Sequence, residues 1–387
     1  MVLRRSLFFL GSFLALSFVT GPGVQAGKPP PPTDPPSGGG SLTAQQQLGE
    51  LLFMDPNLSE PAGQSCKSCH DPAAGFADPD TQFPVSEGVV RGRFGTRNSP
   101  SAGYTGFSPE FTNKRGIQGG QFWDGRSPDL ADQARGPFLN PVEMNNTTKG
   151  QVVGKVQLSP YALRFTQLCG ANAFQPANVE KSYVCLSEAI AAYERSGVFS
   201  PFSSKFDAVQ AGRASFTAQE KRGWDLFTGN AKCAHCHLAK VGAGSPILFT
   251  DFKYHNIGLP ENRDVFALAG AATIDLGLGG VLNDPQQYGR FKNPHLRNIA
   301  VTPPYMHNGV LKTLKDVVHF YNTRDVWPAC DPGLGNRDPE FGKTCWARPE
   351  IPETMDSSFV GNLNLTEAEE DAIVAFMLTL TDGYFSP

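Results

Sequence analysis

Two Cys-x-x-Cys-His pentapeptides stand far apart in this 387-residue chain, one from Cys66 to His70 and the other from Cys233 to His237. Two thiols one helical turn apart can add to the two vinyl groups of one porphyrin, and the adjacent histidine can then bind its iron. This spacing is typical of c-type haem attachment. Zinc binding or thioredoxin-like chemistry is the alternative for a cysteine pair. The histidine that follows both pairs favours two covalently bound haem c groups, attached through Cys66, Cys69, Cys233 and Cys236 and bound at iron by His70 and His237.

The other four of the eight cysteines lie outside these motifs. Cys169 and Cys185 are close in the sequence, as are Cys330 and Cys345, and an oxidising compartment allows such pairs to form disulfides. The sequence does not determine the connectivity.

The group opposite each proximal histidine decides what a haem can do. An electron carrier closes both sixth positions, whereas an enzyme leaves one open. The chain contains no histidine between His70 and His235. A distal histidine for the first haem would therefore have to come from the C-terminal half.

Residues 43–53 and 217–227 form an internal repeat that shares threonine, alanine, glutamine, glycine, leucine and phenylalanine, and each copy precedes one haem motif. Both copies begin with a capping-box pattern and carry apolar residues at helical spacing, as does the closing segment 366–380. Segments rich in Gly, Pro and Asn separate these helices. We therefore predict a mainly α fold with two cytochrome c-like domains, residues 43–210 and 211–387, each with one covalent haem and connected by long loops.

The N-terminus has the pattern of an export signal. Arg4 and Arg5 precede an apolar run and the small-residue ending Val24-Gln-Ala26, so residues 1–26 are predicted to be a signal peptide. A transmembrane anchor is the weaker alternative because the apolar run is short. Residues 27–42 form a Pro/Gly-rich linker. We expect a periplasmic protein without stable membrane insertion.

The formal net charge is −4, and no Lys/Arg cluster follows the signal region. The electrostatic footprint of a nucleic-acid-binding protein is missing, so nucleic acid is excluded as a partner.

Six further motifs flank the haem motifs in a recognisable order. In this order they resemble the bacterial di-haem cytochrome c peroxidase and MauG superfamily, over roughly residues 43 to 384: Arg97-Asn-Ser-Pro100, Gln121-Phe-Trp-Asp-Gly-Arg126, Gln133-Ala-Arg-Gly-Pro137, Asn140-Pro-Val-Glu-Met144, Leu296-Arg-Asn298 and Thr302-Pro-Pro-Tyr-Met-His-Asn-Gly309. The fold alone does not fix the function.

The resemblance implies peroxide chemistry at the first haem, with Glu143 and Gln133 on its distal side. Glu143 is the expected acid/base, since peroxide cleavage needs a group that moves a proton between the two oxygens. From the residues alone, Glu143 reads as a solvated carboxylate in a turn. Trp123 matches a tryptophan between the two haems that can relay electrons. By composition alone it would be a core residue.

Two departures separate this sequence from the peroxidase branch. The loop at residues 88–97 lacks the histidine that blocks the first haem in classical peroxidases, which predicts an open first haem. Tyr321 occupies the position of a methionine ligand to the second haem, and an anionic tyrosinate favours oxidised iron. The alternative places Tyr321 on an apolar helix face as core filling. His319 and Met306 are lesser candidates for the same ligand position.

The resemblance also implies a calcium ion between the haems. Asn98 by its side chain, and Thr302 and Pro304 by their carbonyl oxygens, match the ligand positions, and oxygen donors suit Ca²⁺. His255, His295 and His307 are assigned to haem propionates or packing, with no catalytic role.

Three functions are compatible with these features. The first is a MauG-like oxidase, in which hydrogen peroxide generates high-valent haem iron that oxidises an aromatic residue of a partner protein, with tryptophan as the expected residue. The second is a peroxidase that reduces hydrogen peroxide with electrons from a small cytochrome or cupredoxin. The third is a plain electron carrier. Tyr321 and the missing loop histidine favour the first over the second, and Glu143 disfavours the third.

The sequence does not identify the partner. Trp224, Trp327 and Trp346 are read as core residues that could also carry oxidising equivalents to a docked partner.

Overall fold

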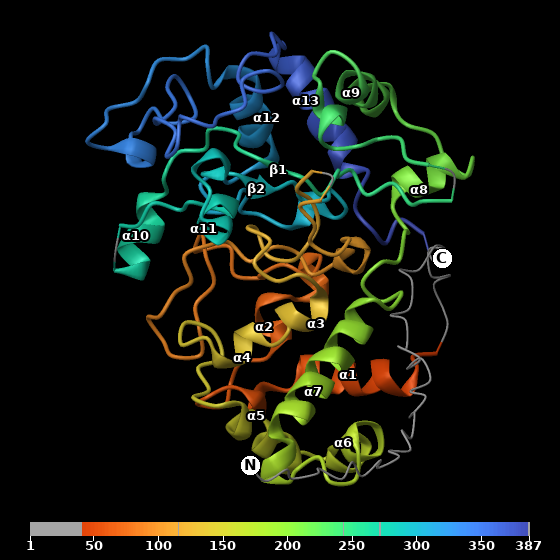
Figure 1. Ribbon diagram of the computed structural model, residues 1–387. Coiled ribbons are helices and arrows are strands. Elements are labelled where there is room, and N and C mark those ends of the chain that lie inside the picture. Colours follow the sequence, from red (N-terminus) through yellow and green to blue (C-terminus); the bar gives the residue numbers. More distant parts are fainter. Residues whose placement is uncertain (1–40, 115, 243, 271, 386–387) are drawn as a thin grey trace, which may run out of the picture. The chain divides into compact units, whose positions relative to one another are not determined.

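The computed structural model describes residues 41–114, 116–242, 244–270 and 272–385 (Figure 1). The predicted signal peptide and the predicted linker as far as residue 40 lie outside these residues. All described residues belong to one compact unit of the chain. Within it, no helix is long and apolar enough to cross a bilayer.

Helices dominate the described residues, as predicted for a mainly α fold. The single sheet found there consists of two short antiparallel strands, β1 (Tyr254–His255) and β2 (Phe291–Lys292). The α-helices in chain order are α1 (Ala44–Met54), α2 (Cys66–Cys69), α3 (Leu130–Gln133), α4 (Gly136–Leu139), α5 (Lys149–Gln157), α6 (Ala162–Cys169), α7 (Val179–Glu194), α8 (Lys205–Gln210), α9 (Ala218–Thr228), α10 (Arg263–Ala269), α11 (Leu278–Leu282), α12 (Leu314–Thr323) and α13 (Glu367–Leu378).

The predicted repeat forms two equivalent helices, α1 and α9. Thr43 caps α1 through a reciprocal pair of hydrogen bonds with Gln46, and Thr217 caps α9 in the same way with Glu220. Thr366 and Glu369 form the capping box of α13. Each capping box satisfies backbone N–H groups that a helix start leaves unpaired, so all three predicted helix starts are confirmed.

The glycine shared by the two repeats lets a second helix approach closely. A Cβ atom on Gly49 would lie 2.0 Å from the carbonyl oxygen of Ala189 in α7, and one on Gly223 would lie 1.8 Å from that of Ala372 in α13. Any larger residue would push the helices apart. Accordingly α1 packs on α7 and α9 packs on α13, and these two pairs are separate in Figure 1.

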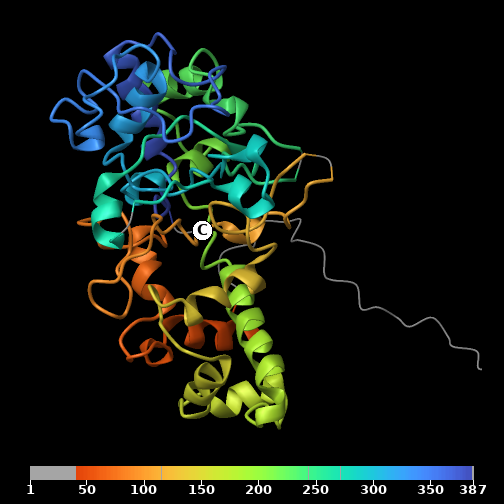
Figure 2. The same cartoon turned by 60° about the vertical axis from the view of Figure 1, so that its left-hand side comes forward.

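Two large hydrophobic clusters accompany these helix pairs. One is built from residues 42–199 and the other from residues 206–380. Phe206, on the N-terminal side of the predicted boundary at residue 210, belongs to the second cluster. A third, small cluster joins Val85 and Phe94 to Val265 of α10, and Figures 1 and 2 both show α10 beside the orange loop that follows α2.

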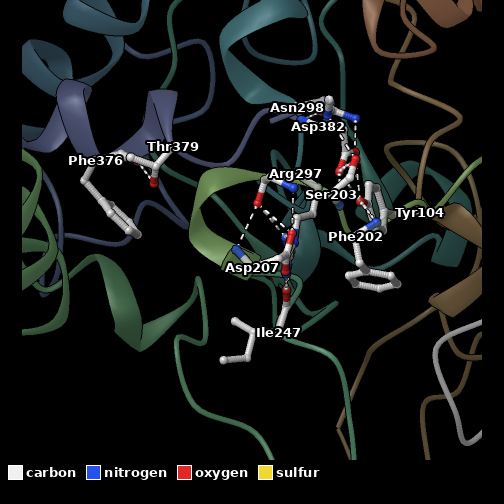
Figure 3. A network of polar contacts seen from close by, with 12 residues as sticks. Tyr104, Phe202, Ser203, Asp207, Ile247, Arg297, Asn298, Phe376, Thr379 and Asp382 are labelled. Atoms are coloured by element: carbon white, nitrogen blue, oxygen red, sulfur yellow. Dashed lines mark hydrogen bonds and ion pairs between the residues drawn. The ribbon is translucent and has the colours of Figure 1, made fainter. Parts of the chain in front are cut away.

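A largely buried polar network ties five distant segments together (Figure 3). The carboxylate of Asp382 accepts hydrogen bonds from the Tyr104 hydroxyl at 2.8 Å, the Asn298 side chain at 2.9 Å and the Ser203 backbone at 2.9 Å. Arg297, only 2 % exposed, donates to Asp207 at 2.7 Å and to the Ile247 carbonyl at 2.7 and 2.9 Å. Buried charges need such partners.

The four cysteines outside the haem motifs form two disulfides, and the structure gives the connectivity that the sequence left open. Disulfides join Cys169 to Cys185 and Cys330 to Cys345, whereas the four cysteines of the haem motifs are free thiols.

Candidate functional site

The first haem motif forms a single helical turn. Cys66 and Cys69 begin and end α2, and the His70 backbone N–H donates to the Cys66 carbonyl at 3.0 Å. The His70 Nδ1 atom lies 3.1 Å from the Phe76 carbonyl oxygen. A hydrogen bond from Nδ1 leaves Nε2 as the free ligand atom. Burial raises the pKa of Cys69 to about 12, so both thiols of this desolvated motif are neutral until they react.

The second motif repeats the arrangement. The His237 backbone N–H donates to the Cys233 carbonyl at 2.9 Å, and the His237 Nδ1 atom lies 2.8 Å from the Phe249 carbonyl oxygen. Burial raises the pKa of Cys233 to about 12. Each motif therefore contributes two cysteines and one histidine to the lining of a cavity.

The first cavity has a volume of about 660 Å³ and brings together the residues that the sequence assigned to the first site. Cys66, Cys69 and His70 line it together with Gln133 and Glu143. Asn140, which ends α4, donates from its side chain to Glu143 Oε1 at 2.6 Å. Burial raises the pKa of Glu143, although the Asn140 hydrogen bond and the Arg126 charge oppose the shift. Such a carboxyl group can both hold and release a proton.

The loop at residues 88–97 packs against the segment that carries Glu143. The Val89 backbone N–H donates to the Glu143 carbonyl at 2.9 Å, and the backbones of Gly88 and Arg93 are hydrogen-bonded at 2.7 Å. A Cβ atom on Gly88 would lie 2.5 Å from the Val142 carbonyl oxygen, so only glycine permits this approach.

The second cavity, of about 270 Å³, is lined by Cys233, Cys236, His237 and Tyr321. Tyr321 comes from α12, and burial, with the two cysteine thiols nearby, raises its pKa. The lesser candidate Met306 also lines this cavity, as does Met377, which the sequence argument did not consider. His319 is not among the lining residues, and its Nδ1 atom lies 2.8 Å from a carboxylate oxygen of Glu370.

Trp123 lines both cavities. Its indole Nε1 donates to the Asn98 carbonyl at 2.9 Å, and its own carbonyl accepts from the Lys292 backbone at 2.7 Å. Asn98 therefore holds the ring and Lys292 holds the backbone of Trp123, at the wall that the two cavities share.

His307 is a residue that the sequence analysis assigned to haem propionates or packing, with no catalytic role. It lines both cavities, and within the described residues it and His70 are the histidines of the first cavity. Its ring stacks on Phe291 with centroids 3.5 Å apart, and its buried Nε2 atom has no protein partner. Burial lowers its pKa to about 4, so it is neutral. The Tyr-Met-His-Asn-Gly motif that contains His307 was the feature of the sequence that could have indicated this position.

The three residues assigned to calcium all line the second cavity. Asn98 donates from its side-chain nitrogen to the Pro84 carbonyl at 3.2 Å, and the Thr302 hydroxyl donates to the Ile299 carbonyl at 3.3 Å. Pro304 follows a cis peptide bond. Their oxygen donors are of the type that Ca²⁺ uses.

The chain is similar to several characterised proteins. Residues 43–215 match the family model described as di-haem cytochrome c peroxidase. Methylamine utilization protein MauG of Paracoccus denitrificans is 41 % identical over 354 residues, which cover 88 % of this chain and 89 % of the relative. Cytochrome c551 peroxidase of Pseudomonas aeruginosa is 34 % identical over 277 residues, covering 71 % and 70 %.

This chain belongs to the di-haem cytochrome c peroxidase and MauG family. Two solved structures agree. The diheme peroxidase BthA of Burkholderia thailandensis superposes with a TM-score of 0.73 at 34 % identity, covering 88 % of this chain and 87 % of that one. A MauG-like protein associated with microbial copper homeostasis gives 0.68 at 28 % identity, covering 94 % and 98 %. The chain is thus an oxidoreductase that acts on peroxide, and its family implies two haem c cofactors.

The residues of this di-haem family member fit those cofactors. Besides the free thiols and the two Nε2 atoms, several buried polar atoms that line the cavities have no protein partner within the described residues. They are Gln64 Oε1 and Glu194 Oε2 in the first cavity, His295 Nδ1 in the second and His307 Nε2 in both. Buried polar atoms are rarely left unsatisfied, so a bound group or water is expected beside them.

Proposed function

We propose that this chain is a periplasmic MauG-like enzyme, which uses hydrogen peroxide to oxidise an aromatic residue of a partner protein. Tryptophan is the proposed target residue. The observation that carries the proposal is that Glu143 lines the first cavity and Tyr321 lines the second. The 41 % identity to a protein named MauG supports the same branch of the family. The division into haem domains at residues 43–210 and 211–387 is part of this proposal.

When bound, two haem c groups would supply redox-active iron that can pass electrons to peroxide. The chain contributes proton transfer and positioning. Glu143 moves a proton between the two peroxide oxygens, and Asn140 holds its carboxyl group in place. Gln133, on the same cavity wall, orients the peroxide by hydrogen bonding. Trp123 passes electrons between the two cavities.

Tyr321 is proposed as the iron ligand of the second haem. Burial raises the pKa of this phenol, so it would not ionise at neutral pH without a positive charge beside it. Coordination to a metal supplies such a charge. Asn98, Thr302 and Pro304 are proposed to hold calcium near the wall shared by the cavities.

The second candidate function is reduction of hydrogen peroxide with electrons from a small redox protein. The likeness to cytochrome c551 peroxidase favours it. His307 at the first cavity also favours it, because a histidine that reaches the first iron would close the site until reduction.

One experiment separates the two functions. Hydrogen peroxide is added to the oxidised holoprotein with the protein encoded beside it as trial partner, and the near-infrared spectrum and partner mass are recorded. The MauG-like function predicts a reaction without prior reduction, a charge-resonance band and a modified partner. A reaction that requires prior reduction, with rapid oxidation of reduced cytochrome and an unmodified partner, would show that the protein is a peroxidase.

A further inference from the structure

Glu194 is a buried acid that lines the first cavity and takes no part in the proposed mechanism. It ends α7, which packs on α1 and α3, and it lines the cavity together with Ile190, one helical turn earlier. Glu194 is 7 % exposed, and its Oε2 atom has no hydrogen-bond partner within the described residues. Leaving a buried carboxyl oxygen without a partner is costly, so the charge state of Glu194 should depend on what occupies the cavity.

Two features of this position disfavour the ionised form of Glu194. Burial removes the carboxyl group from water and is the main reason that its pKa rises to about 8, with the neighbouring Arg195 opposing the shift. The group also belongs to the last residue of α7, where the backbone carbonyls of the helix carry partial negative charge. Glu194 is therefore a neutral acid at neutral pH, and a modest change in its surroundings can ionise it.

The charged groups on the elements that pack on α7 have other partners or face solvent. The Thr105–Phe107 turn contributes no charged side chain, and Arg164 of α6 is exposed. The other elements contribute hydrogen-bonded pairs: Tyr193 with Glu50 of α1, Arg135 with Asp132 of α3 at 2.7 Å, and Glu180 with Lys149 of α5 at 2.7 Å. Arg195 and the groups beside Cys66 are thus the charges to which Glu194 responds.

Cys66 links the charge of Glu194 to the first haem motif. Burial raises the pKa of the Cys66 thiol, and the charge of Glu194 is the next largest cause of that shift. A charge on Glu194 is therefore felt at the cysteine through which the family implies that a haem is attached. Charges interact more strongly in a desolvated cavity than in water, so a change of charge at this haem should alter the proton affinity of Glu194.

Two other acids with a raised pKa line the same cavity, but each has a hydrogen-bond donor. Glu143 accepts from Asn140 at 2.6 Å, and Glu350 accepts from the backbone N–H of Asp275 at 2.9 Å. Such a donor stabilises the carboxylate whatever the charge in the cavity. Because Oε2 of Glu194 lacks one, the ionisation of Glu194 should be the most sensitive of the three to that charge.

We propose that Glu194 is a proton-binding site coupled to the redox state of the first haem. When the iron gains one electron, the Glu194 carboxylate takes up one proton from solvent, and when that electron leaves, the carboxyl group returns the proton to solvent. The total charge of the cavity then changes little as the iron is reduced and oxidised. This inference goes beyond the proposed function, and it applies equally to the second candidate function because both place iron in this cavity.

The first measurement is the reduction potential of the first haem as a function of pH. A mediated electrochemical titration of the holoprotein, followed by the absorption of the first haem, gives this potential from about pH 6 to about pH 10. A carboxylate stabilises oxidised iron, so the wild-type potential should fall as the pH rises, by at most about 59 mV for each tenfold fall in proton concentration. Glu194→Gln, which stays neutral, should keep the low-pH value of the wild type throughout.

Glu350→Gln and Glu188→Gln are the matched controls, because Glu350 lines the same cavity and Glu188 lies on the exposed side of α7. Both should keep the wild-type dependence on pH, and haem absorption with urea unfolding shows whether each variant is loaded and folded. A wild-type potential that does not change with pH would overturn the inference even if Glu194→Gln fails to fold. Loss of the dependence in Glu350→Gln but not in Glu194→Gln would also overturn it.

The second measurement detects the proton itself. Redox-difference infrared spectra of the holoprotein at about pH 9 should show the C=O stretching band of a protonated carboxyl group appearing on reduction, and this band should shift in heavy water. Glu194→Gln should lack the band, whereas Glu188→Gln should retain it. The inference is wrong if the wild type shows no such band or if the band persists in Glu194→Gln.

Neither measurement uses peroxide or a partner protein, so failure of this inference is distinguishable from failure of the proposed function. If a partner is modified but the first haem titrates independently of pH, the inference is wrong and the proposed function stands. If Glu194→Gln abolishes the pH dependence but the wild type modifies no partner, the inference stands and the proposed function is wrong.

Discussion

Arg97 and Asp275 are joined by two hydrogen bonds of 2.7 Å although they are 178 residues apart in the sequence. Arg97 also donates to Asp124 at 2.6 Å. Burial alone would raise the pKa of Asp275, but the hydrogen bonds and charge of Arg97 lower it. Both residues line the first cavity, so this pair fixes the end of the 88–97 loop to the C-terminal half.

Arg97→Met should destabilise the protein by about 3 kcal/mol, because it leaves the partly buried Asp275 without its cation and Asp124 with Arg126 alone. Urea unfolding of the holoprotein measures the change. Arg337→Met is the control, since Arg337 pairs with Asp264 near the surface and its loss should cost about 0.5 kcal/mol. An equal loss of unfolding free energy in the two variants would show that Arg97 and its partners stabilise the protein no more than a surface ion pair does.

Glu143→Gln should slow the reaction with peroxide about a hundredfold to ten-thousandfold, because the amide cannot transfer the proton. Stopped-flow absorption of the first haem measures the rate. Glu60→Gln is the control, since Glu60 lies outside the lining of the cavity and pairs with Lys155. A wild-type rate in Glu143→Gln would exclude Glu143 as the acid/base.

Tyr321→Phe should change the absorption and electron paramagnetic resonance spectra of the second haem and leave those of the first unchanged. Tyr305→Phe provides the control within the same cavity, because the Tyr305 hydroxyl is already used by the Ile299 carbonyl at 3.0 Å. If Tyr321→Phe leaves both haem spectra as they are, Tyr321 is core filling and Met306 or Met377 becomes the leading ligand candidate.

His307→Phe should leave the first haem in its resting spin state, because an open first site has no histidine ligand to lose. Electron paramagnetic resonance of the oxidised protein distinguishes an open first site from one that a histidine closes. A change from low spin to high spin on removing His307 would mean that this imidazole closes the first site, and the peroxidase function would then be favoured.

Glu194→Gln should change how stability depends on pH. Burial raises the pKa of Glu194 from 4.5 to about 8, with Arg195 opposing. Between these two values the unfolded chain loses a proton that the folded protein keeps, so the free energy of unfolding of the wild type falls as the pH rises. Glutamine has no such proton. The variant should therefore gain stability relative to the wild type across this window, by about 1.4 kcal/mol for each unit of pKa shift.

Urea unfolding at several pH values measures this difference. Glu188→Gln, on the exposed side of the same helix α7, is the matched control. A stability difference between Glu194→Gln and the wild type that stays constant from pH 5 to 8 would contradict a raised pKa for Glu194.

Much of the local structure was predictable because it depends on residues within a few positions of one another. The capping boxes at Thr43, Thr217 and Thr366 need only the residue three positions further on. The haem motifs span five residues, and the two disulfides close segments of 15 and 16 residues. The sequence alone therefore predicted the two haem motifs, the repeated helix and the mainly α class, and the structure contains the repeated helix and the mainly α class.

The convergence of distant side chains was decided only by the tertiary structure. The pairing of Arg97 with Asp275, the position of His307 on both cavities and the stacking of Trp327 on Trp346 all depend on how long, irregular loops return to the helices. Hydrophobic periodicity and capping depend on residues within about one helical turn of each other. They do not determine which loop lies opposite a given residue. Packing sets those distances, and packing depends on the whole chain.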